Sequence, residues 1–455
     1  MKTIARLLIA NRGEIAVRII RACKALGIES VLAVSEADRD SLPATMADRA
    51  VCIGPARAAD SYLKIDALVT ACLGTGAQAL HPGYGFLAEN PELAEACATN
   101  GITFVGPAAS HIRRMGNKIS ARALAAECGV ATLPGSEGVE KPAQAEALAR
   151  KTGFPVLLKA AGGGGGRGMR IVHAPAQLPG AFDEASGEAQ AAFGDGTIYL
   201  EHYIANARHI EVQVLGDQFG NVIHAGERDC SVQRRFQKVI EEAPSPAVSE
   251  PLRAELCGAA VTLAQKLGYS SVGTVEFILD RDNGRFYFLE MNTRIQVEHP
   301  VTEQITGIDL VAEQINAAAG NPLGLTQSDV GFGGHAIECR INAESAERGF
   351  APTPGRIADF RPPAGAGIRV ETHCQPGTVV PPYYDSLIAK VIASGKDRVQ
   401  AAERMRKALA EFAITGLETN LAFQRRLLDH ADFRDGNINT RWLEDVIMGT
   451  HRSEE

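Results

Sequence analysis

Several features that assign proteins to broad classes are missing from this sequence of 455 residues. No apolar run approaches the length of a membrane span, and the short apolar run at the N-terminus is not a signal peptide. We find no internal repeat and no low-complexity tail. Positive charge is not in excess either, because the formal net charge is −8. These absences argue against a membrane protein, a repeat protein and a general nucleic-acid binder.

Paired cysteines are also missing. The nine cysteines are dispersed along the chain, and no two of them form a Cys-x-x-Cys pair. This spacing predicts no zinc site and fits reduced, mostly buried thiols in the cytoplasm. A chain of this length is expected to divide into about two to four domains.

Two common phosphate-binding motifs are absent. Residues 11–14, after the first strand candidate, read Asn-Arg-Gly-Glu and contain one glycine, whereas a dinucleotide fingerprint needs three. The glycine run at 162–166 is not followed by Gly-Lys-Ser or Gly-Lys-Thr, so it is not a Walker A loop. We therefore expect neither NAD binding nor a P-loop.

The first 114 residues nevertheless predict a doubly wound, Rossmann-like sheet. The loop 81–90 follows one of its strands, at the end of the sheet where such folds bind ligands. Tyr84 in this loop is a candidate substrate contact, and a plain structural turn is the alternative. The expected strands are 4–10, 30–34, 77–80 and 103–105, and the expected helices are 15–26, 62–72 and 91–100.

The most informative stretch is 285–299. From Glu290 onward its polar side chains alternate with apolar ones, and an extended chain places such residues on one face. A half-solvated strand with an arbitrary polar face is the alternative, but the set is chemically assorted rather than a mixture of Lys, Glu and Thr. It comprises Glu290, Asn292, Arg294, Gln296 and Glu298.

A second acid lies in the apolar strand candidate 273–279. The turn 281–284 predicts a hairpin that places this acid, Glu276, beside Glu290. Two carboxylates with an amide oxygen suit a hard cation that also carries phosphates. We therefore expect Mg²⁺ or Mn²⁺ at Glu276, Glu290 and Asn292.

The glycine run is flanked by strand-like segments. Lys159 lies in the buried strand candidate 154–160, where a lysine is costly unless it meets an anion. The run predicts a hairpin tip whose backbone N–H groups close over phosphates, and a flexible linker is the alternative. Lys118, in the first turn of a helix expected over 115–127, is either a phosphate ligand or a surface lysine.

Further polar groups lie on expected strands. Glu201 comes near the end of strand 197–204 and is a candidate adenine contact. The residues Gln233 to Lys238 make a cationic cluster, which indicates anion capture or an exposed basic loop. Alternation on two strands predicts shared polar faces: His209, Glu211 and Gln213 on one, and Glu338, Arg340 and Asn342 on the other.

Taken together, these groups describe phosphoryl transfer from a nucleoside triphosphate to a small anion. At this point the chain resembles the biotin carboxylase family of the ATP-grasp enzymes over essentially its whole length. The motifs that carry the resemblance are 159–170, 227–231, 290–300 and 338–344.

The resemblance implies an α/β and α+β architecture with an ATP-grasp fold. Residues 1–114 would form the Rossmann-like N-terminal domain and 331–455 the C-terminal biotin carboxylase domain. Residues 115–330 would form the ATP-grasp domain, with a glycine-rich lid at about 132–203. A homodimer is the expectation for this family.

The resemblance also implies a reaction in two stages. ATP, with Mg²⁺ or Mn²⁺, would phosphorylate bicarbonate to carboxyphosphate, which would break down to CO₂ and phosphate. Biotin would then be carboxylated at N1 after its proton is taken by the released phosphate. This is the first half-reaction of acetyl-CoA carboxylase, in fatty acid biosynthesis, or of another acyl-CoA carboxylase.

Each site residue takes an implied role from this resemblance. Glu298 would be the base and Arg340 would stabilise the biotin enolate, with Tyr84 near the biotin ring. The bicarbonate ligands would be Lys238, Arg294, Gln296 and the backbone of Val297. The nucleotide site would comprise Lys118, Lys159, Gly165, Gly166, Met169, Glu201, His202, Ile204, His209, Gln233, Glu276, Ile278, Leu289 and Glu290.

The sequence departs from the family pattern at two positions. His202 stands where many relatives have lysine, and Phe236 where many have histidine. No biotin-attachment segment like Ala-Met-Lys-Met occurs, so we expect biotin to arrive on a separate carrier protein and the carboxyltransferase to be separate too. The alternatives are another ATP-grasp ligase, of the carboxylate–amine or carbamoyl-phosphate type, and a non-catalytic nucleotide-binding protein.

Overall fold

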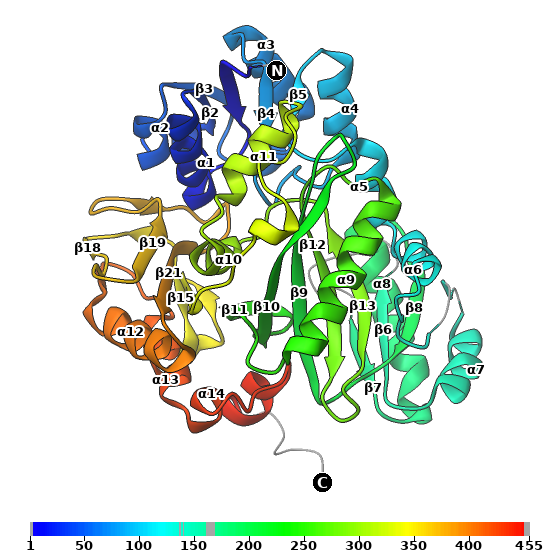
Figure 1. Cartoon of the computed structure of the whole chain (residues 1–455). Coiled ribbons are helices and arrows are strands. Elements are labelled where there is room, and N and C mark those ends of the chain that lie inside the picture. The colour runs from blue at the N-terminus through cyan, green and yellow to red at the C-terminus, as the bar shows by residue number, and fades with distance from the viewer. Residues whose placement is uncertain (1–2, 136–137, 140, 161–168, 450–455) are drawn as a thin grey trace.

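The computed structural model describes residues 3–135, 138–139, 141–160 and 169–449 (Figure 1). In Figure 1 the N-terminal sheet lies at the top, the lid strands β6 to β8 at the lower right, and helices α12 and α13 at the lower left. No helix in the described ranges combines the length and the hydropathy needed to cross a lipid bilayer.

The N-terminal region is a five-stranded parallel sheet with the strand order β3-β2-β1-β4-β5. Separate apolar cores cover its two faces, which confirms the predicted doubly wound arrangement. Its elements are β1 (Arg6–Ile9), α1 (Gly13–Leu26), β2 (Glu29–Ser35), α2 (Leu42–Met46), β3 (Arg49–Gly54), α3 (Ile65–Thr75), β4 (Ala79–His81), α4 (Pro91–Thr99) and β5 (Thr103–Phe104).

Helix α1 shows why the sequence pattern predicts the helices of this region. Its apolar side chains, among them Ile15 and Ile19, are buried, and Gly27 ends the helix at a φ of 69°. Strand β3 was not predicted; it is a largely exposed edge strand whose apolar run is only four residues long.

The lid is a three-stranded antiparallel sheet with two helices packed on it. The predicted hairpin of β6 (Val156–Ala160) and β7 (Arg170–Val172) is confirmed, and β8 (Ile198–His202) pairs with the other edge of β6. The hairpin tip, with Gly165 and Gly166, lies outside the described residues. Helices α7 (Pro142–Thr152) and α8 (Leu178–Phe193) were not predicted.

The segment before the lid contains two helices where one was expected. Helix α5 (Ala109–Gly116) ends before Asn117, whose side chain caps α6 (Lys118–Glu127) by accepting a hydrogen bond from the Ser120 N–H at 3.0 Å. Lys118 is therefore the first residue of a helix, as the sequence indicated.

The largest element is an eight-stranded antiparallel sheet with the order β13-β12-β9-β10-β11-β14-β21-β19. Helices α9, α12 and α13 pack on it, as do α10 and α11. The strands are β9 (Ala207–Gly216), β10 (Val222–Arg234), β11 (Gln237–Ala243), β12 (Ser271–Asp280), β13 (Phe286–Asn292), β14 (His335–Asn342), β19 (Ile368–Thr372) and β21 (Leu387–Gly395).

The helices around this sheet are α9 (Glu250–Leu267), α10 (His299–Thr306), α11 (Leu310–Ala318), α12 (Arg398–Glu411), α13 (Leu421–Asp429) and α14 (Ala431–Arg434). Short strands complete the C-terminal region: β15 (Glu344–Ser345), β16 (Ala351–Pro352), β17 (Gly355–Arg356), β18 (Asp359–Arg361), β20 (Val379–Val380) and β22 (Ala413–Thr415).

Two alternation patterns in this sheet are confirmed. On β9, Ile210 and Val212 enter the core beneath α9, which leaves His209 and Glu211 on the opposite face. On β14 the apolar positions enter the core beneath α12, and Arg340 faces the other side of the sheet. Both polar faces look toward the same cleft, described next.

Candidate active site

A cleft of about 870 Å³ lies between the lid, the eight-stranded sheet and the loop after β4. Every predicted site residue in the described part of the chain lines it. They are Tyr84, Lys118, Lys159, Met169, Glu201, His202, Ile204, His209, Gln233, Lys238, Glu276, Ile278, Leu289, Glu290, Asn292, Arg294, Gln296, Val297, Glu298 and Arg340.

The predicted acidic pair is held by a hairpin. Strands β12 and β13 pair antiparallel, and Glu276 stands directly opposite Glu290 in the register. Burial would raise the pKa of Glu276, but Lys238 and His209 outweigh it and hold this pKa well below its ordinary value. Burial and the charge of Glu276 both raise the pKa of Glu290. The two acids therefore face each other in different electrostatic environments.

This pair fits a divalent cation. A cation would offset the repulsion that raises the pKa of Glu290, and carboxylate oxygens are the ligands that Mg²⁺ prefers. Asn292 donates through Nδ2 to Glu276 at 2.8 Å, and its Oδ1 accepts from Arg294 at 2.8 Å. The amide oxygen retains a second lone pair for a metal.

A second group of potential ligands overlaps the predicted set. The ligand atoms of His209, Glu211 and Glu276 lie within 4.8 Å of one another. Both acids of this group face protein cations: Glu211 pairs with Arg228 and Lys238, and Glu276 pairs with Lys238 and His209. The set Glu276, Glu290 and Asn292 stays a prediction.

Lys238 lies at the centre of the cleft floor, among three buried acids. Its Nζ lies 2.5 Å from Glu211, 3.0 Å from Glu276 and 2.6 Å from Glu298. Burial would lower the pKa of Lys238, but these carboxylates raise it well above its ordinary value. The ammonium is therefore a fixed positive charge in a poorly solvated place.

Glu298 is held between two cations. Lys238 donates to one carboxylate oxygen at 2.6 Å and Arg340 to the other at 2.9 Å. Burial would raise the pKa of Glu298, but Lys238, Arg340 and Arg228 lower it well below its ordinary value. Glu298 is therefore ionised, and an anion that enters here would share its two cations.

The polar groups of 290–298 converge, but not on one extended strand. The predicted alternation is wrong beyond Asn292, where β13 ends and a loop leads to α10. The Thr293 N–H donates to Glu89 at 3.0 Å, so it does not pair with a strand. Arg294 also donates to Glu89, at 2.9 Å, and to Gln296 at 2.7 Å.

At the lid end of the cleft, the ammonium group of Lys159 pairs with a carboxylate of the protein itself. Its Nζ donates to Glu201 at 2.5 Å, and Arg122 donates to the other oxygen of Glu201 at 2.7 Å. Lys118 donates to the Ala160 carbonyl at 3.2 Å. The two lysine ammonium groups lie 5.8 and 5.6 Å from the centroid of the Tyr199 ring. The carboxylate of Glu201 is thus engaged by two protein cations.

The cationic cluster is divided by a hairpin turn. Gln233 and Lys238, on β10 and β11, line the cleft. Arg234 also borders the cleft, where its guanidinium lies 4.2 Å from the centroid of the Phe350 ring, and the Arg235 N–H donates to Glu444 at 2.7 Å. Most of the segment expected as a possible basic loop is therefore strand, with its exposed part at the tip.

The sequence analysis did not identify the acids that accept hydrogen bonds from two arginines and a tyrosine of the site. Arg340 donates to Glu241 at 2.6 Å, Arg294 to Glu89, and Tyr84 donates to Glu14. Glu241 follows Val239 and Ile240 on β11, a strand that also contains Lys238 and Glu242, so only this short apolar pair could have marked it as buried. Glu89 and Glu14 come from distant parts of the chain, and nothing local indicates their partners.

Comparison with known proteins matches three family models in order. Residues 3–112 match the biotin carboxylase N-terminal domain, 117–326 the ATP-binding domain of the carbamoyl-phosphate synthase L chain, and 338–445 the biotin carboxylase C-terminal domain. Among curated relatives, biotin carboxylase 1 of Bacillus subtilis is 52% identical over 98% of this chain and 100% of its own length.

Two further relatives extend this picture. A pyruvate carboxylase subunit of Methanothermobacter thermautotrophicus is 48% identical over 98% of this chain and 90% of its own length. The solved biotin carboxylase domain dimer of the Hydrogenobacter thermophilus 2-oxoglutarate carboxylase, in complex with MgADP, ADP and bicarbonate, is 47% identical. It superposes with a TM-score of 0.96 and covers 100% of both chains.

Proposed function

The chain belongs to the biotin carboxylase family of the ATP-grasp enzymes, and we propose how its cleft divides the work between residues. The reaction is the ATP-dependent carboxylation of biotin. The observation that carries the assignment of roles is Glu298, ionised between Lys238 and Arg340 on the cleft floor.

The lid end of the cleft would hold MgATP. Lys118, Lys159, His209 and Gln233 supply groups for the phosphates, and the apolar side chains of Met169, Ile278 and Leu289 suit the adenine ring. Glu201, His202 and Ile204 would contact adenine through the backbone. Glu276, Glu290 and Asn292 would hold Mg²⁺, which neutralises phosphate charge when bound.

The floor of the cleft would bind and deprotonate bicarbonate. Lys238, Arg294, Gln296 and the Val297 backbone would hold the anion, and Glu298 would accept its proton. The bicarbonate oxygen then attacks the γ-phosphorus, and ADP leaves. A base of low pKa suffices because the same cations that lower the pKa of Glu298 also stabilise the deprotonated substrate.

The second stage would take place at Arg340. Carboxyphosphate breaks down to CO₂ and phosphate, and the phosphate takes the N1 proton of biotin. The guanidinium of Arg340, oriented by Glu241 at 2.6 Å, would stabilise the enolate oxygen of biotin while N1 attacks CO₂. Tyr84, from the loop after β4, would lie near the biotin ring.

We propose that biotin arrives on a separate carrier protein, and that a separate carboxyltransferase delivers the carboxyl group to acetyl-CoA or another acyl-CoA. Relatives named for pyruvate and 2-oxoglutarate carboxylases are similar to this chain over nearly its whole length. The similarity therefore does not identify the acceptor, which has to be determined by experiment. Pairing the carboxylated carrier with purified carboxyltransferases of different specificity, and measuring acceptor carboxylation, identifies it.

The domain limits and the assembly are also part of the proposal. We propose an N-terminal domain at 1–114, an ATP-grasp domain at 115–330 with its lid at about 132–203, and a C-terminal domain at 331–455. The solved relative described as a dimer supports a homodimer, which light scattering on the purified protein tests. The nine free thiols support a reducing, cytoplasmic location.

Phosphate release from MgATP tests the function. We expect release to require bicarbonate and to rise when free biotin is added. Release that ignores both, but responds to ammonia or an amino acid, would indicate another ATP-grasp ligase and would overturn the roles of Arg294, Glu298 and Arg340.

Glu298→Gln tests the proposed base. We expect bicarbonate-dependent turnover to fall by roughly a hundredfold or more, because the amide cannot accept the proton. MgATP affinity, measured by calorimetry, should be nearly unchanged. The matched control is Glu255→Gln, on the exposed face of α9, which should leave both quantities as they are. Unchanged turnover in Glu298→Gln would remove Glu298 as the base.

A further inference from the structure

A fully buried lysine lies beside the cleft and has no role so far. Lys390, on β21, has 0% of its side chain exposed. Its Nζ makes two polar contacts: it donates to the Val297 carbonyl at 2.7 Å and pairs with Glu14 at 3.1 Å. A buried ammonium is costly, and these two contacts offset part of that cost.

The carbonyl that Lys390 holds is a particular one. It belongs to the peptide that joins Val297 to Glu298, and a peptide unit is planar. Fixing the direction of this carbonyl therefore fixes the direction of the Glu298 N–H and the point from which the Glu298 side chain starts. No regular strand pairing holds the loop here, because β13 has already ended at Asn292.

The anion that holds Lys390 comes from the other side of the cleft. Glu14 lies in the first turn of α1, is 2% exposed, and also accepts the hydrogen bond from the Tyr84 hydroxyl. One ammonium thus joins three distant segments of the chain: the start of α1, the loop before α10, and β21. The loop before α10 carries groups assigned above to bicarbonate. Glu14 contacts Tyr84, and Lys390 stands opposite Arg340, so the other two segments adjoin the residues assigned to biotin and to the enolate.

Lys390 also stands directly opposite Arg340 in the register of β14 and β21, so the two cations share one face of the sheet. They are kept apart by different anions. Arg340 pairs with Glu241 and Glu298, whereas Lys390 pairs with Glu14. Lys390 therefore reaches the loop backbone without competing for the carboxylate of Glu298.

We propose that Lys390, held in place by Glu14, is a positioning residue that sets the Val297–Glu298 peptide for the binding and deprotonation of bicarbonate. The inference rests on the proposed roles of Val297 and Glu298. It predicts that loss of the ammonium impairs the use of bicarbonate and leaves the use of ATP intact.

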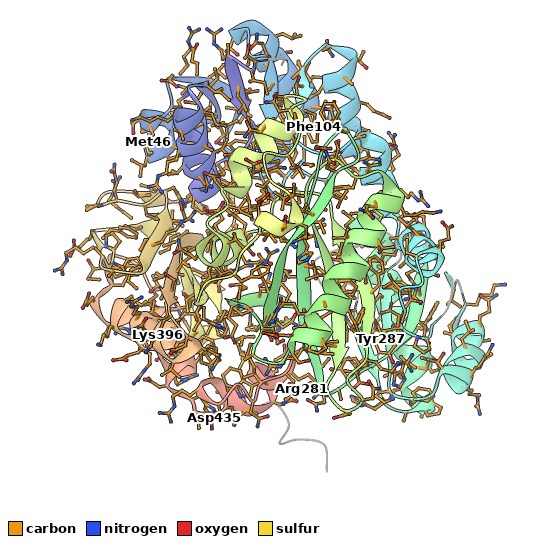
Figure 2. All side chains as sticks on the ribbon, viewed as in Figure 1. Met46, Phe104, Arg281, Tyr287, Lys396 and Asp435 are labelled. Atoms are coloured by element: carbon orange, nitrogen blue, oxygen red, sulfur yellow. The ribbon has the colours of Figure 1, made fainter. Side chains whose placement is uncertain are left out.

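Lys390→Met alone is a poor test, because it leaves the Glu14 carboxylate buried and unpaired, and the protein can unfold for that reason. The useful comparison is between Glu14→Gln and the double variant Glu14→Gln/Lys390→Met. Both lack the carboxylate charge, and they differ only in the lysine. Lys396→Met is the control for loss of a lysine, since Lys396 is exposed just beyond β21 (Figure 2).

For each variant, kcat and the KM values for bicarbonate and ATP are measured as bicarbonate-dependent phosphate release with free biotin. Relative to Glu14→Gln, we expect the double variant to raise the KM for bicarbonate about tenfold or more and to lower kcat, with the KM for ATP unchanged. Lys396→Met should match the unmodified protein.

Two results would overturn the inference. One is a double variant whose bicarbonate KM and kcat equal those of Glu14→Gln, which would leave Lys390 with charge balance as its only role. The other is an equal rise in the KM values for ATP and bicarbonate, which would indicate a general loss of structure. Failure of the proposed function is seen separately, as turnover that persists in Glu298→Gln.

Discussion

Individual buried charged groups contribute to the stability of the folded protein, and Glu242 is an example. Glu242, on β11, accepts hydrogen bonds from His335 at 2.8 Å and from Arg398 at 2.6 Å. Burial alone would raise the pKa of Glu242, but these two partners lower it to about 2. The carboxylate is therefore more stable in the folded protein than in the unfolded chain.

This lowered pKa predicts a defined loss of stability in acid. The contribution of the Glu242 carboxylate to the free energy of unfolding is complete above its ordinary pKa of 4.5. This contribution is lost as the pH falls toward 2. Below about pH 4.5, each pH unit removes close to 1.4 kcal/mol of it. We expect Glu242→Gln to be less stable than the unmodified protein by roughly 3 kcal/mol at pH 7, with a gap that narrows below pH 4.5.

Urea unfolding of both proteins between pH 7 and pH 3.5 measures the gap. The neighbouring exposed acid Glu250 provides the control, because Glu250→Gln should show no narrowing of this kind. A gap that stays constant across this range would show that the partners do not lower the pKa of Glu242.

At the residue scale, the sequence predicted well which side chains line the cleft and poorly which residues hold them in place. Glu276, Glu290 and Glu298 were found because an acid inside an apolar or alternating segment is unusual and visible locally. Glu14, Glu89 and Lys390 act across long sequence separations, and their contacts exist only once the sheet regions are packed together. Local patterns contain no information about such contacts.

Among the elements, the hairpin of β10 and β11 has an unusual turn. Its two-residue loop, Arg235 and Phe236, has φ values of 46° and 65°, which glycine and asparagine adopt far more readily. The Phe236 side chain is 43% exposed at the edge of the cleft. The turn therefore keeps a strained backbone next to the nucleotide site.

Comparing Phe236→Gly with Phe236→Ala isolates this strain, because both remove the ring. At an ordinary position alanine is the more stabilising residue, since it restricts the unfolded chain more than glycine does. Here the positive φ penalises alanine, so we expect the glycine variant to be more stable by about 1 kcal/mol. Thermal unfolding measures the difference, and an alanine variant of equal or greater stability would contradict the strain.

Helices and strands with a regular spacing of apolar residues were predicted from the sequence, and those without such spacing were not. Helix α1 and the hairpin of β12 and β13 have regular apolar spacing and recognisable ends, and the structure confirms them. Helices α7 and α8 were missed, because they are rich in alanine and pack only on the small lid sheet. The alternation of polar and apolar residues beyond Asn292 led to a wrong prediction of a strand, because a loop can also bring polar groups together.

At the scale of the whole molecule, the architecture followed from the order of its elements. Alternating strands and helices predicted the parallel N-terminal sheet. The pairing of β11 with β14 could not be read from the sequence, because 91 residues and other strands separate Ala243 from His335. The lid, the eight-stranded sheet and the N-terminal region belong to separate sheets, and their meeting at the cleft also depends on contacts between distant parts of the chain.

One consequence of the eight-stranded sheet concerns cutting the chain. The proposed limit between residues 330 and 331 divides this sheet between β11 and β14, where Ile240 faces Cys339 and Ala243 faces Ala336. The cut would leave two unpaired strand edges, and such edges are templates for aggregation. It would also divide the apolar core that Val232 and Ile240 share with β14.

We therefore expect fragments 1–330 and 331–455 to be insoluble when each is produced alone. Production of both in one cell should instead give a soluble complex that releases phosphate from ATP in the presence of bicarbonate. A fragment 331–455 that unfolds cooperatively by itself, as followed by circular dichroism, would contradict this. Split-protein reporters would have to be cut elsewhere, in a loop that crosses no pair of strands, because the proposed domain limit runs through the middle of a sheet.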